Sequence, residues 1–310
     1  MSSDLRPGMS AETGPGMGAE LRPGESAGPG GPIRLIAFDL DGTLLDDRKG
    51  IPPENIRALE EAADRGIVPV PATGRIVRGI PEAVKRLPGA RYFIVSNGAG
   101  VYDAREGRLL YRGDVPLELA LRCYEYMDTL PVLYDCYQND MGYMSRWMYD
   151  SCAPYFTTEP HMLELIRRLR VPVEDLKETL RQRGEPLQKL QMFFRPEDLP
   201  LRERELRRIP ELFPELVATT SVSNNIEINS VNAGKGKAMR ALAAHLGIRP
   251  EETLAFGDGS NDRELLELAG WGVAMANADP AVKAVADEIA ASNNEAGVAR
   301  VIRRILAAQG

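Results

Sequence analysis

Short apolar runs alternate along the chain with segments whose apolar residues recur at helical spacing. Residues 33–38 form the first run, and they show little polar alternation, which is typical of a strand buried on both faces of a parallel sheet. Two further runs, at 67–72 and 92–95, are separated by helical patterns at 54–66 and 76–86. This strand–helix alternation predicts a parallel α/β sheet with right-handed crossovers.

The alternation is interrupted between residue 101 and about residue 230. The interruption contains two hairpin patterns, expected at 131–137 with 143–146 and at 217–221 with 226–229. It also contains a further strand, expected at 187–194, and a charged helix, expected at 195–209. The α/β rhythm then resumes, with elements expected at 235–245, 253–256, 265–268, 271–275, from 279 onward and at 295–308. We therefore expect an α+β domain inserted into an α/β domain.

The expected domain boundaries place the α/β core at 33–100 and 227–310 and the inserted α+β cap at 101–226. Residues 1–32 are dominated by Gly, Pro, Ser, Ala and Glu, and the phrase LRPGMSA recurs in them as LRPGESA. A segment of this composition buries too little apolar surface to offset its ordering entropy. We therefore expect a disordered tail.

Composition and charge narrow the classes of function. A chain of 310 residues that is 44% hydrophobic can bury two ordinary cores, and its net charge of -7 argues against a general nucleic-acid or anionic-membrane binder. No apolar run approaches the roughly 18 residues of a membrane span, and we expect neither membrane insertion nor export. Three cysteines, an odd number, fit free thiols in a reducing compartment, so we expect a cytoplasmic protein. We leave open whether it is a monomer or a homodimer.

Polar residues capable of chemistry, together with one glycine, stand after the predicted strands and at the start of one helix. In chain order they are Asp39, Asp41, Thr73, Gly74, Asn97, Lys235, Asp258, Asn261 and Asp262. Parallel strands end at one edge of a sheet, so the carboxylates should gather there, where like charges repel unless a cation is present. Carboxylate oxygens suit Mg²⁺, and a lysine between two glycines at a helix start suits phosphate. These residues predict a site for Mg²⁺ and a phosphate ester.

Four short motifs carry a resemblance to a known family. They are FDLDGTLL at 38–45, ATGR at 72–75, KGKA at 235–238 and GDGSND at 257–262. In this order they resemble the motifs of the haloacid dehalogenase-like (HAD) phosphatases. The long insertion after the second motif, together with NNEAGVA at 293–299, resembles the Cof-type branch. The resemblance implies a doubly wound, Rossmann-like parallel core with an inserted α+β cap of the C2, type IIB kind.

The same resemblance implies roles for individual residues. Asp39 would be the nucleophile that forms an aspartyl-phosphate, and Asp41 the general acid and base, since two residues along an extended chain share one side. The Mg²⁺ ligands would be Asp39, the backbone carbonyl of Asp41 and Asp258, with Asp262 orienting a metal-bound water. The implied phosphate- and substrate-binding residues are Thr73, Gly74, Lys235, Asn261 and Asn97.

The expected function is that of a Mg²⁺-dependent phosphatase acting on a small phosphorylated metabolite. Sugar phosphates and phosphomonoesters resembling flavin mononucleotide or pyridoxal phosphate are all open as substrates. A phosphotransferase or phosphomutase acting on a sugar phosphate is an alternative, because it too would pass through an aspartyl-phosphate. A catalytically inactive binding protein is disfavoured, because Asp39, Asp41 and Lys235 are all present.

Some of these residues also have purely structural interpretations. Asp262 could cap the helix that it begins, and Asn97 in Ser-Asn-Gly is by default a turn residue. Arg75 is interpreted as a helix-start residue with surface contacts and is left out of the catalytic set. The Tyr and Met residues of the cap are expected mainly in its core.

Overall fold

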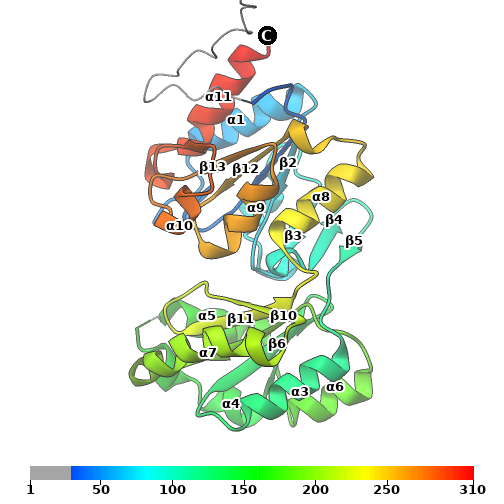
Figure 1. Cartoon of the computed structure of the whole chain (residues 1–310), viewed down its shortest axis with the longest axis vertical. Coiled ribbons are helices and arrows are strands. Elements are labelled where there is room, and N and C mark those ends of the chain that lie inside the picture. The colour runs from blue at the N-terminus through cyan, green and yellow to red at the C-terminus, as the bar shows by residue number, and fades with distance from the viewer. Residues whose placement is uncertain (1–28, 159) are drawn as a thin grey trace, which may run out of the picture.

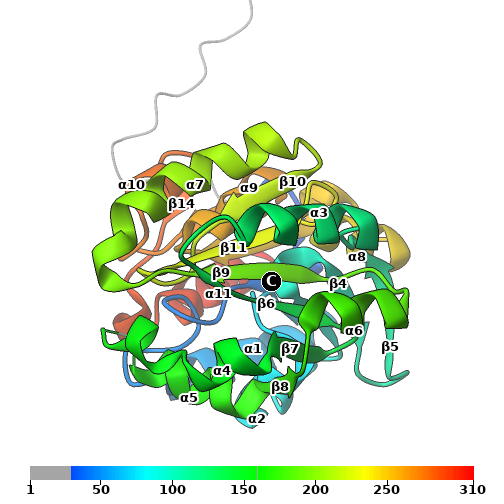
Figure 2. The same cartoon turned by 90° about the horizontal axis from the view of Figure 1, so that it is seen from below.

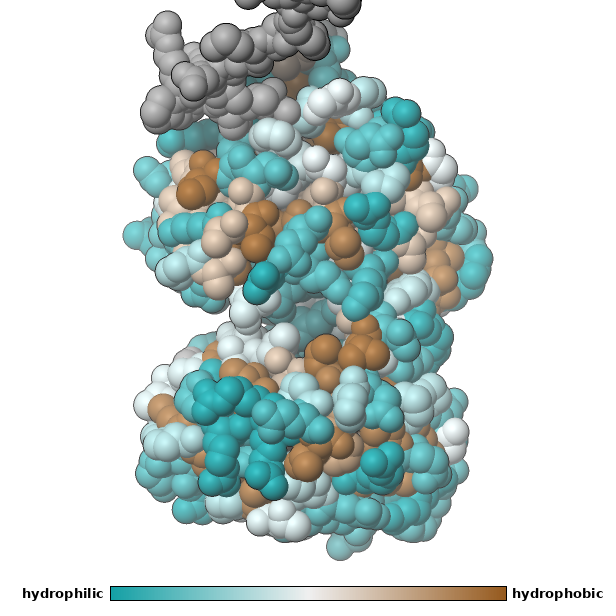
Figure 3. Space-filling view, in the orientation of Figure 1, coloured by the Kyte–Doolittle hydropathy of each residue, from teal (hydrophilic) through white to brown (hydrophobic). Residues whose placement is uncertain are grey.

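The protein has two lobes joined by a narrow waist, each built around its own sheet (Figure 1, Figure 3). The computed structural model describes residues 29–158 and 160–310, and most of the expected tail, residues 1–28, lies outside them. The upper lobe of Figure 1 contains both ends of the α/β pattern, and the lower lobe contains the insertion. Within the described residues, no helix is both long and apolar enough to cross a membrane.

A five-stranded parallel sheet forms the centre of the core. Its strands lie in the order β14-β13-β12-β1-β2. The strands are β1 (Leu35–Phe38), β2 (Val68–Pro71), β12 (Thr253–Gly257), β13 (Trp271–Ala274) and β14 (Glu288–Ile289). All four residues of β1 are buried, as its uninterrupted apolar pattern predicts. Strand β1 lies between β12 and β2, so Asp39, which follows it, lies within the carboxyl edge of the sheet and not at its margin.

Helices cover this sheet and leave its carboxyl edge open towards the cap. They are α1 (Pro53–Asp64), α8 (Lys235–His245), α9 (Arg263–Leu268), α10 (Pro280–Lys283) and α11 (Gly297–Ala308). Helices α1 and α11 pack against each other, and so do α8 and α9, which lie in front of the sheet in Figure 1. The predicted helices at 54–66, 235–245 and 295–308 are confirmed within one or two residues at most ends.

The single helix predicted at 76–86 is wrong. A 3₁₀ turn at Val77–Gly79 is followed by an extended Ile80 and then by the one-turn helix α2 (Glu82–Lys85). Ile80 has φ -73° and ψ 129°, because the ring of the next residue, Pro81, disfavours the helical region for the residue before it. The proline divides what the apolar spacing alone predicted as one helix.

The third predicted strand has a different partner from the one expected. Strand β3 (Tyr92–Val95) meets the parallel sheet through one bridge, Ala72 to Ile94. Its ladder is antiparallel with β4 (Gly100–Asp103), which pairs in turn with β5 (Arg108–Arg112). The Ser96–Gly98 turn reverses the chain directly after β3, so the next strand returns along it.

A six-stranded sheet with helices packed on it forms the cap. The strand order is β10-β11-β9-β6-β7-β8. The strands are β6 (Leu133–Gln138), β7 (Met141–Ser145), β8 (Arg170–Val173), β9 (Lys189–Phe193), β10 (Leu216–Thr219) and β11 (Asn225–Ser230). The helices are α3 (Leu117–Met127), α4 (Arg146–Asp150), α5 (Pro160–Leu169), α6 (Leu176–Arg183) and α7 (Leu199–Leu212), seen around the sheet in Figure 2. Both predicted hairpins are confirmed.

The two faces of the cap sheet differ in polarity. On β9, Leu190 and Met192 belong to the apolar cluster of the cap, whereas the alternate residues Lys189 and Gln191 line a cavity that faces the core. Most of the cap's Tyr and Met residues are in that apolar cluster, as expected. Packing also places Val101 with the core cluster and β11 with the cap sheet. On this basis we propose residues 114–230 as the cap.

Candidate active site

The cavity between the lobes has a volume of ≈ 560 Å³, and the carboxyl ends of β1, β2 and β12 form its core wall. That size suits a small metabolite. Asp39, Asp41, Thr73, Gly74, Asp258, Asn261 and Asp262 of the predicted site line it. The structure therefore brings together residues from three distant parts of the chain.

Lys235 does not itself line the cavity, but it pairs with two of the predicted acids that do. It is the first residue of α8 and is 1% exposed, and its Nζ donates to Asp39 Oδ1 and to Asp262 Oδ1, both at 2.5 Å. Burial alone would lower the pKa of Lys235, but the charges of Asp262 and Asp39 outweigh burial and raise it. The lysine is therefore a permanent positive charge beside the predicted nucleophile.

Three carboxylates offer oxygen ligands to a cation. One oxygen from each of Asp39, Asp258 and Asp262 lies within 4.8 Å of the others. Burial, and then the neighbouring acids, raise the pKa of Asp258 to about 6, and burial raises that of Asp39. Gly42 allows the Asp258 carboxylate to lie close to the loop after β1, because a Cβ at position 42 would lie 2.3 Å from Asp258 Oδ2. The φ of Gly42, +84°, also favours glycine.

The hydrogen bonds of these carboxylates separate direct ligands from an outer one. Asp262 uses Oδ1 for Lys235, and its Oδ2 accepts from the amides of Asp258 and Gly259, each at 3.0 Å. Among the described residues, none donates to the second oxygen of Asp39 or of Asp258. Asp39 and Asp258 are thus free to contact a hard cation, and Asp262 holds the loop behind them. Its side chain makes no capping bond to α9; it instead caps the preceding 3₁₀ turn, Ser260–Asp262, by accepting from the Gly259 amide.

Asp41 is held by two cations. Arg75 donates to Asp41 Oδ2 from Nε at 3.2 Å and from an Nη at 2.7 Å, and Lys49 donates to Oδ1 at 2.9 Å. Burial would raise the pKa of Asp41, but these two positive charges outweigh burial and lower it. The interpretation of Arg75 as a surface residue is wrong: its position after a strand end, within ATGR, was the available signal.

The loop after β2 presents a hydroxyl and an amide. Thr73 is buried, and its Oγ1 accepts from the amide of Arg75 at 3.2 Å. The Gly74 amide donates to no residue in the described part of the chain, so it can donate to a ligand oxygen. A Cβ at Gly74 would lie 2.8 Å from Asn97 Oδ1, which explains the need for glycine.

Asn97 and Asn261 bind each other beside the cavity. Asn261 Nδ2 donates to Asn97 Oδ1 at 3.1 Å, and Asn97 Nδ2 donates to Glu227 Oε2 at 2.5 Å. Asn97 lies behind the cavity wall and does not line it. Sequence reasoning missed Glu227 and its partner Lys189, although the alternation of polar and apolar residues along β9 and β11 was a signal for a polar face.

The arrangement combines a buried carboxylate, a fixed ammonium and a second carboxylate held by cations, which suits phosphoryl transfer. A model of the haloacid dehalogenase-like hydrolases matches residues 36–302. Phosphatase YwpJ of Bacillus subtilis (strain 168) is 31% identical over 298 residues, covering 88% of this chain and 100% of the relative. The 5-amino-6-(5-phospho-D-ribitylamino)uracil phosphatase YcsE of the same strain is 30% identical, covering 87% and 95%.

A solved structure shows the same architecture. That haloacid dehalogenase-like hydrolase from B. subtilis has a TM-score of 0.71 and 30% identity, covering 87% of this chain and 99% of the other. The chain belongs to the haloacid dehalogenase-like hydrolase family, and it is an enzyme of the phosphatase kind. The predicted family and the predicted fold, a parallel core with an inserted α+β cap, are both confirmed.

Proposed function

We propose that the protein is a Mg²⁺-dependent phosphatase that hydrolyses a small phosphorylated metabolite through an aspartyl-phosphate on Asp39. One observation carries the proposal. Asp39, buried at the end of β1, accepts from Lys235 on Oδ1, and one of its oxygens lies within 4.8 Å of ligand oxygens of Asp258 and Asp262. The positive charge of Lys235 favours the ionised form of Asp39 against the effect of burial, and an ionised carboxylate can attack phosphorus without first losing a proton to a base.

Residues around Asp39 supply the other parts of the reaction. Lys235, the Thr73 hydroxyl and the Gly74 amide would donate to the phosphoryl oxygens and stabilise the charge that develops on them. Asp41 would give a proton to the leaving oxygen and later take one from the attacking water, and Arg75 orients it.

The carboxylates also fit the expected cation. Asp39, Asp258 and the backbone carbonyl of Asp41 would hold Mg²⁺, with Asp262 fixing the loop. When bound, the cation neutralises part of the negative charge of the carboxylates and the phosphate ester.

The cap wall supports a polar, uncharged leaving group. The arginines and the lysine of the cap that line the cavity are already paired: Arg170 donates to Asp135 at 2.6 Å, Lys189 donates to Glu227 at 2.8 Å, and Arg202 pairs with Glu203. Gln191 lies between the first two of these pairs and lines the cavity. The wall therefore offers hydrogen-bonding groups of balanced charge to the part of the metabolite beyond its phosphate.

Phosphate release from a panel of phosphomonoesters, measured with Mg²⁺ and with EDTA, tests the proposal. We expect turnover with Mg²⁺, loss of turnover with EDTA, and a fall of at least about 10³-fold for Asp39→Asn. Asp47→Asn is the matched control, because Asp47 belongs to the same loop but binds Asn293 and Asn294 away from the cavity. Turnover that persists in Asp39→Asn would refute the mechanism, and isomerisation of a sugar phosphate without free phosphate would favour a mutase.

A further inference from the structure

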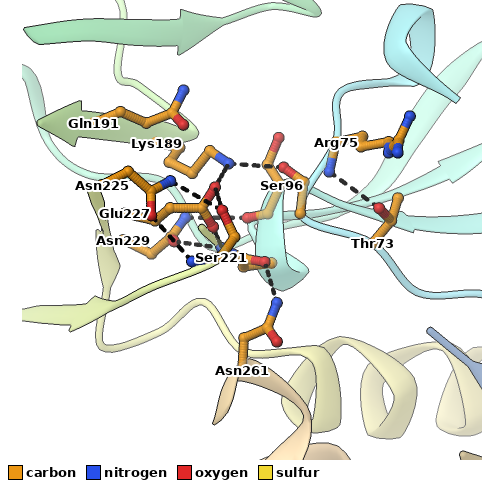
Figure 4. Close-up of polar contacts among 12 residues, drawn as sticks. Thr73, Arg75, Ser96, Lys189, Gln191, Ser221, Asn225, Glu227, Asn229 and Asn261 are labelled. Carbon is orange, nitrogen blue, oxygen red and sulfur yellow. Dashed lines mark hydrogen bonds and ion pairs between the residues drawn. The ribbon is translucent and has the colours of Figure 1, made fainter. Parts of the chain in front are cut away.

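One buried lysine crosses from the cap to the core. Lys189 lies on β9 and is 1% exposed, and its Nζ donates to the Gly74 backbone carbonyl and to Glu227 Oε1, both at 2.8 Å. Figure 4 shows its side chain extending from the cap strand towards the loop that carries Thr73. The contact therefore joins a cap strand to the loop that holds the predicted phosphate ligands.

The loop at 73–75 has all three of its backbone carbonyls fixed. The Thr73 carbonyl accepts from the amide of Asn97 at 3.0 Å, and the Arg75 carbonyl accepts from the amide of Ser96 at 2.9 Å. The carbonyl between them accepts from Lys189. Of the three, this middle one is fixed by the cap.

The middle carbonyl decides how the loop faces the cavity. It belongs to the peptide unit between Gly74 and Arg75, whose planar geometry places its N–H on the opposite side. That N–H donates to Thr73 Oγ1, so the hydroxyl oxygen accepts there and its proton is left to donate to another group, such as a phosphoryl oxygen in the cavity that Thr73 lines. The same peptide unit leads into Arg75, whose guanidinium holds Asp41.

Glu227 connects Lys189 to the second core turn. Its Oε1 accepts from Lys189 and from Ser221, and its Oε2 accepts from Asn97. Asn97 has φ +58° and the preceding Ser96 has φ +51°, a left-handed conformation that non-glycine residues rarely adopt and that needs support from neighbours. The cap supplies this support through Glu227 and through Asn229, which donates to the Ser96 carbonyl at 3.0 Å.

We propose that Lys189, held by Glu227, is a positioning residue for the phosphatase reaction: from the cap it orients the 73–75 loop, so that the core site is complete only when the cap is docked. The inference rests on the proposed function. In this proposal the cap encloses the substrate and also orients the core residues that take part in the chemical step. Lys189 acts through Thr73 and Arg75 and does not itself meet the phosphoryl group.

A purely structural role makes a different prediction. If Lys189 served only to neutralise Glu227 within the cap, its removal would lower the stability of the cap and leave turnover by the folded protein unchanged. If it orients the loop, kcat falls while KM for a small ester changes little, because the loop geometry matters most in the transition state.

The test measures kcat and KM on p-nitrophenyl phosphate with Mg²⁺, together with urea unfolding. We expect Lys189→Met to lower kcat by roughly 10- to 100-fold with KM within about threefold, since small misplacements of catalytic groups have effects of this size. Lys189→Arg should recover part of the loss. Lys177→Met is the control, because Lys177 is a cap lysine that pairs with Asp128 outside the cavity. Unchanged kcat in folded Lys189→Met would overturn the inference.

Two further measurements separate the possible failures. The double variant Lys189→Met/Glu227→Gln leaves no unpaired buried charge, so it keeps the test valid if the single variant does not fold, and it should show the same loss of kcat. Amide hydrogen exchange of residues 73–76 should be faster in the Lys189 variants than in Lys177→Met. A wild-type protein inactive on all phosphate esters refutes the proposed function, whereas unchanged exchange refutes the positioning by Lys189.

Discussion

Replacing Gly98 with alanine tests how tightly the turn after β3 is packed against the helix that carries Lys235. Gly98 has φ +85°, and a Cβ there would lie 2.1 Å from the Gly234 carbonyl oxygen and 2.6 Å from the Lys235 amide nitrogen. These are backbone atoms, which cannot move aside as a flexible side chain can. Alanine should therefore push the start of α8 and displace Lys235 from Asp39.

Gly66 provides the comparison that isolates the packing effect. It has φ +78°, but a Cβ there would meet no atom within 4 Å. Gly66→Ala should thus lose about 1–2 kcal/mol for the left-handed conformation alone, and Gly98→Ala should lose a further 1–3 kcal/mol or so for overpacking. The gain from a less flexible unfolded chain is the same for both variants and cancels in the comparison.

Urea unfolding and phosphate release measure the two consequences. We expect Gly98→Ala to be less stable than Gly66→Ala and to lose about 10²-fold in kcat if the Lys235 ammonium moves by about 1 Å. Equal unfolding free energies for the two variants would refute the reasoning on packing. A destabilised but fully active Gly98→Ala would show that the start of α8 adjusts without moving the ammonium.

Two further predictions concern other charged contacts. Arg75→Met should lower kcat at least about tenfold with little change in KM, because Asp41 loses both hydrogen bonds to its Oδ2; an unchanged kcat would contradict a role for that contact. Asp103, whose hydrogen bonds from Arg91 lower its pKa from 3.8 to about 2, should stabilise the fold above pH 4 or so and lose this contribution as the pH falls towards 2. This contribution to the free energy of unfolding should be about 1–2 kcal/mol, after allowance for solvent screening of the partly exposed Arg91. Urea unfolding at several pH values measures it: between about pH 4 and about pH 2 the unfolding free energy of the wild type should fall by this much more than that of Asp103→Asn.

The part of the site that is local to strand ends could be predicted from the sequence. Asp39 and Asp258 follow buried strands that lie side by side, so the rule that parallel strands end at one edge was enough to bring them together. Lys235 was predictable for a similar reason, since a helix start following a glycine is a natural site for an anion. In each case the functional atom lies close to the backbone element that the pattern predicts.

Contacts made by long side chains across the cavity could not be predicted in this way. Arg75 contacts Asp41 across the site, and Lys189 of the cap contacts Gly74 of the core. Neither contact can be predicted from the spacing of residues along the sequence. The alternation along β9 and β11 was a signal that Lys189 and Glu227 lie on a polar face, and it was not used; even so, the orientation of that face depends on how the two domains dock. The error at Pro81 had a local cause, because apolar spacing was given more weight than the proline.

The three neighbouring carboxylates Asp39, Asp258 and Asp262 lower the stability of the fold, which indicates that they serve binding or catalysis. Asp258 has a pKa of about 6, above the ordinary value of 3.8, mainly because of burial and then because of Asp262. For an acid whose pKa is raised on folding, the unfolded chain loses its proton first, so the fold loses stability as the pH rises from about 4 to about 6. A shift of this size corresponds to about 3 kcal/mol at neutral pH, before screening of a group that is not fully buried. Lys235 offsets part of this repulsion, but it is one cation among three acids, with Asp39 the third. A cluster kept despite such a cost is best explained by a cation or a developing charge that the carboxylates meet during function.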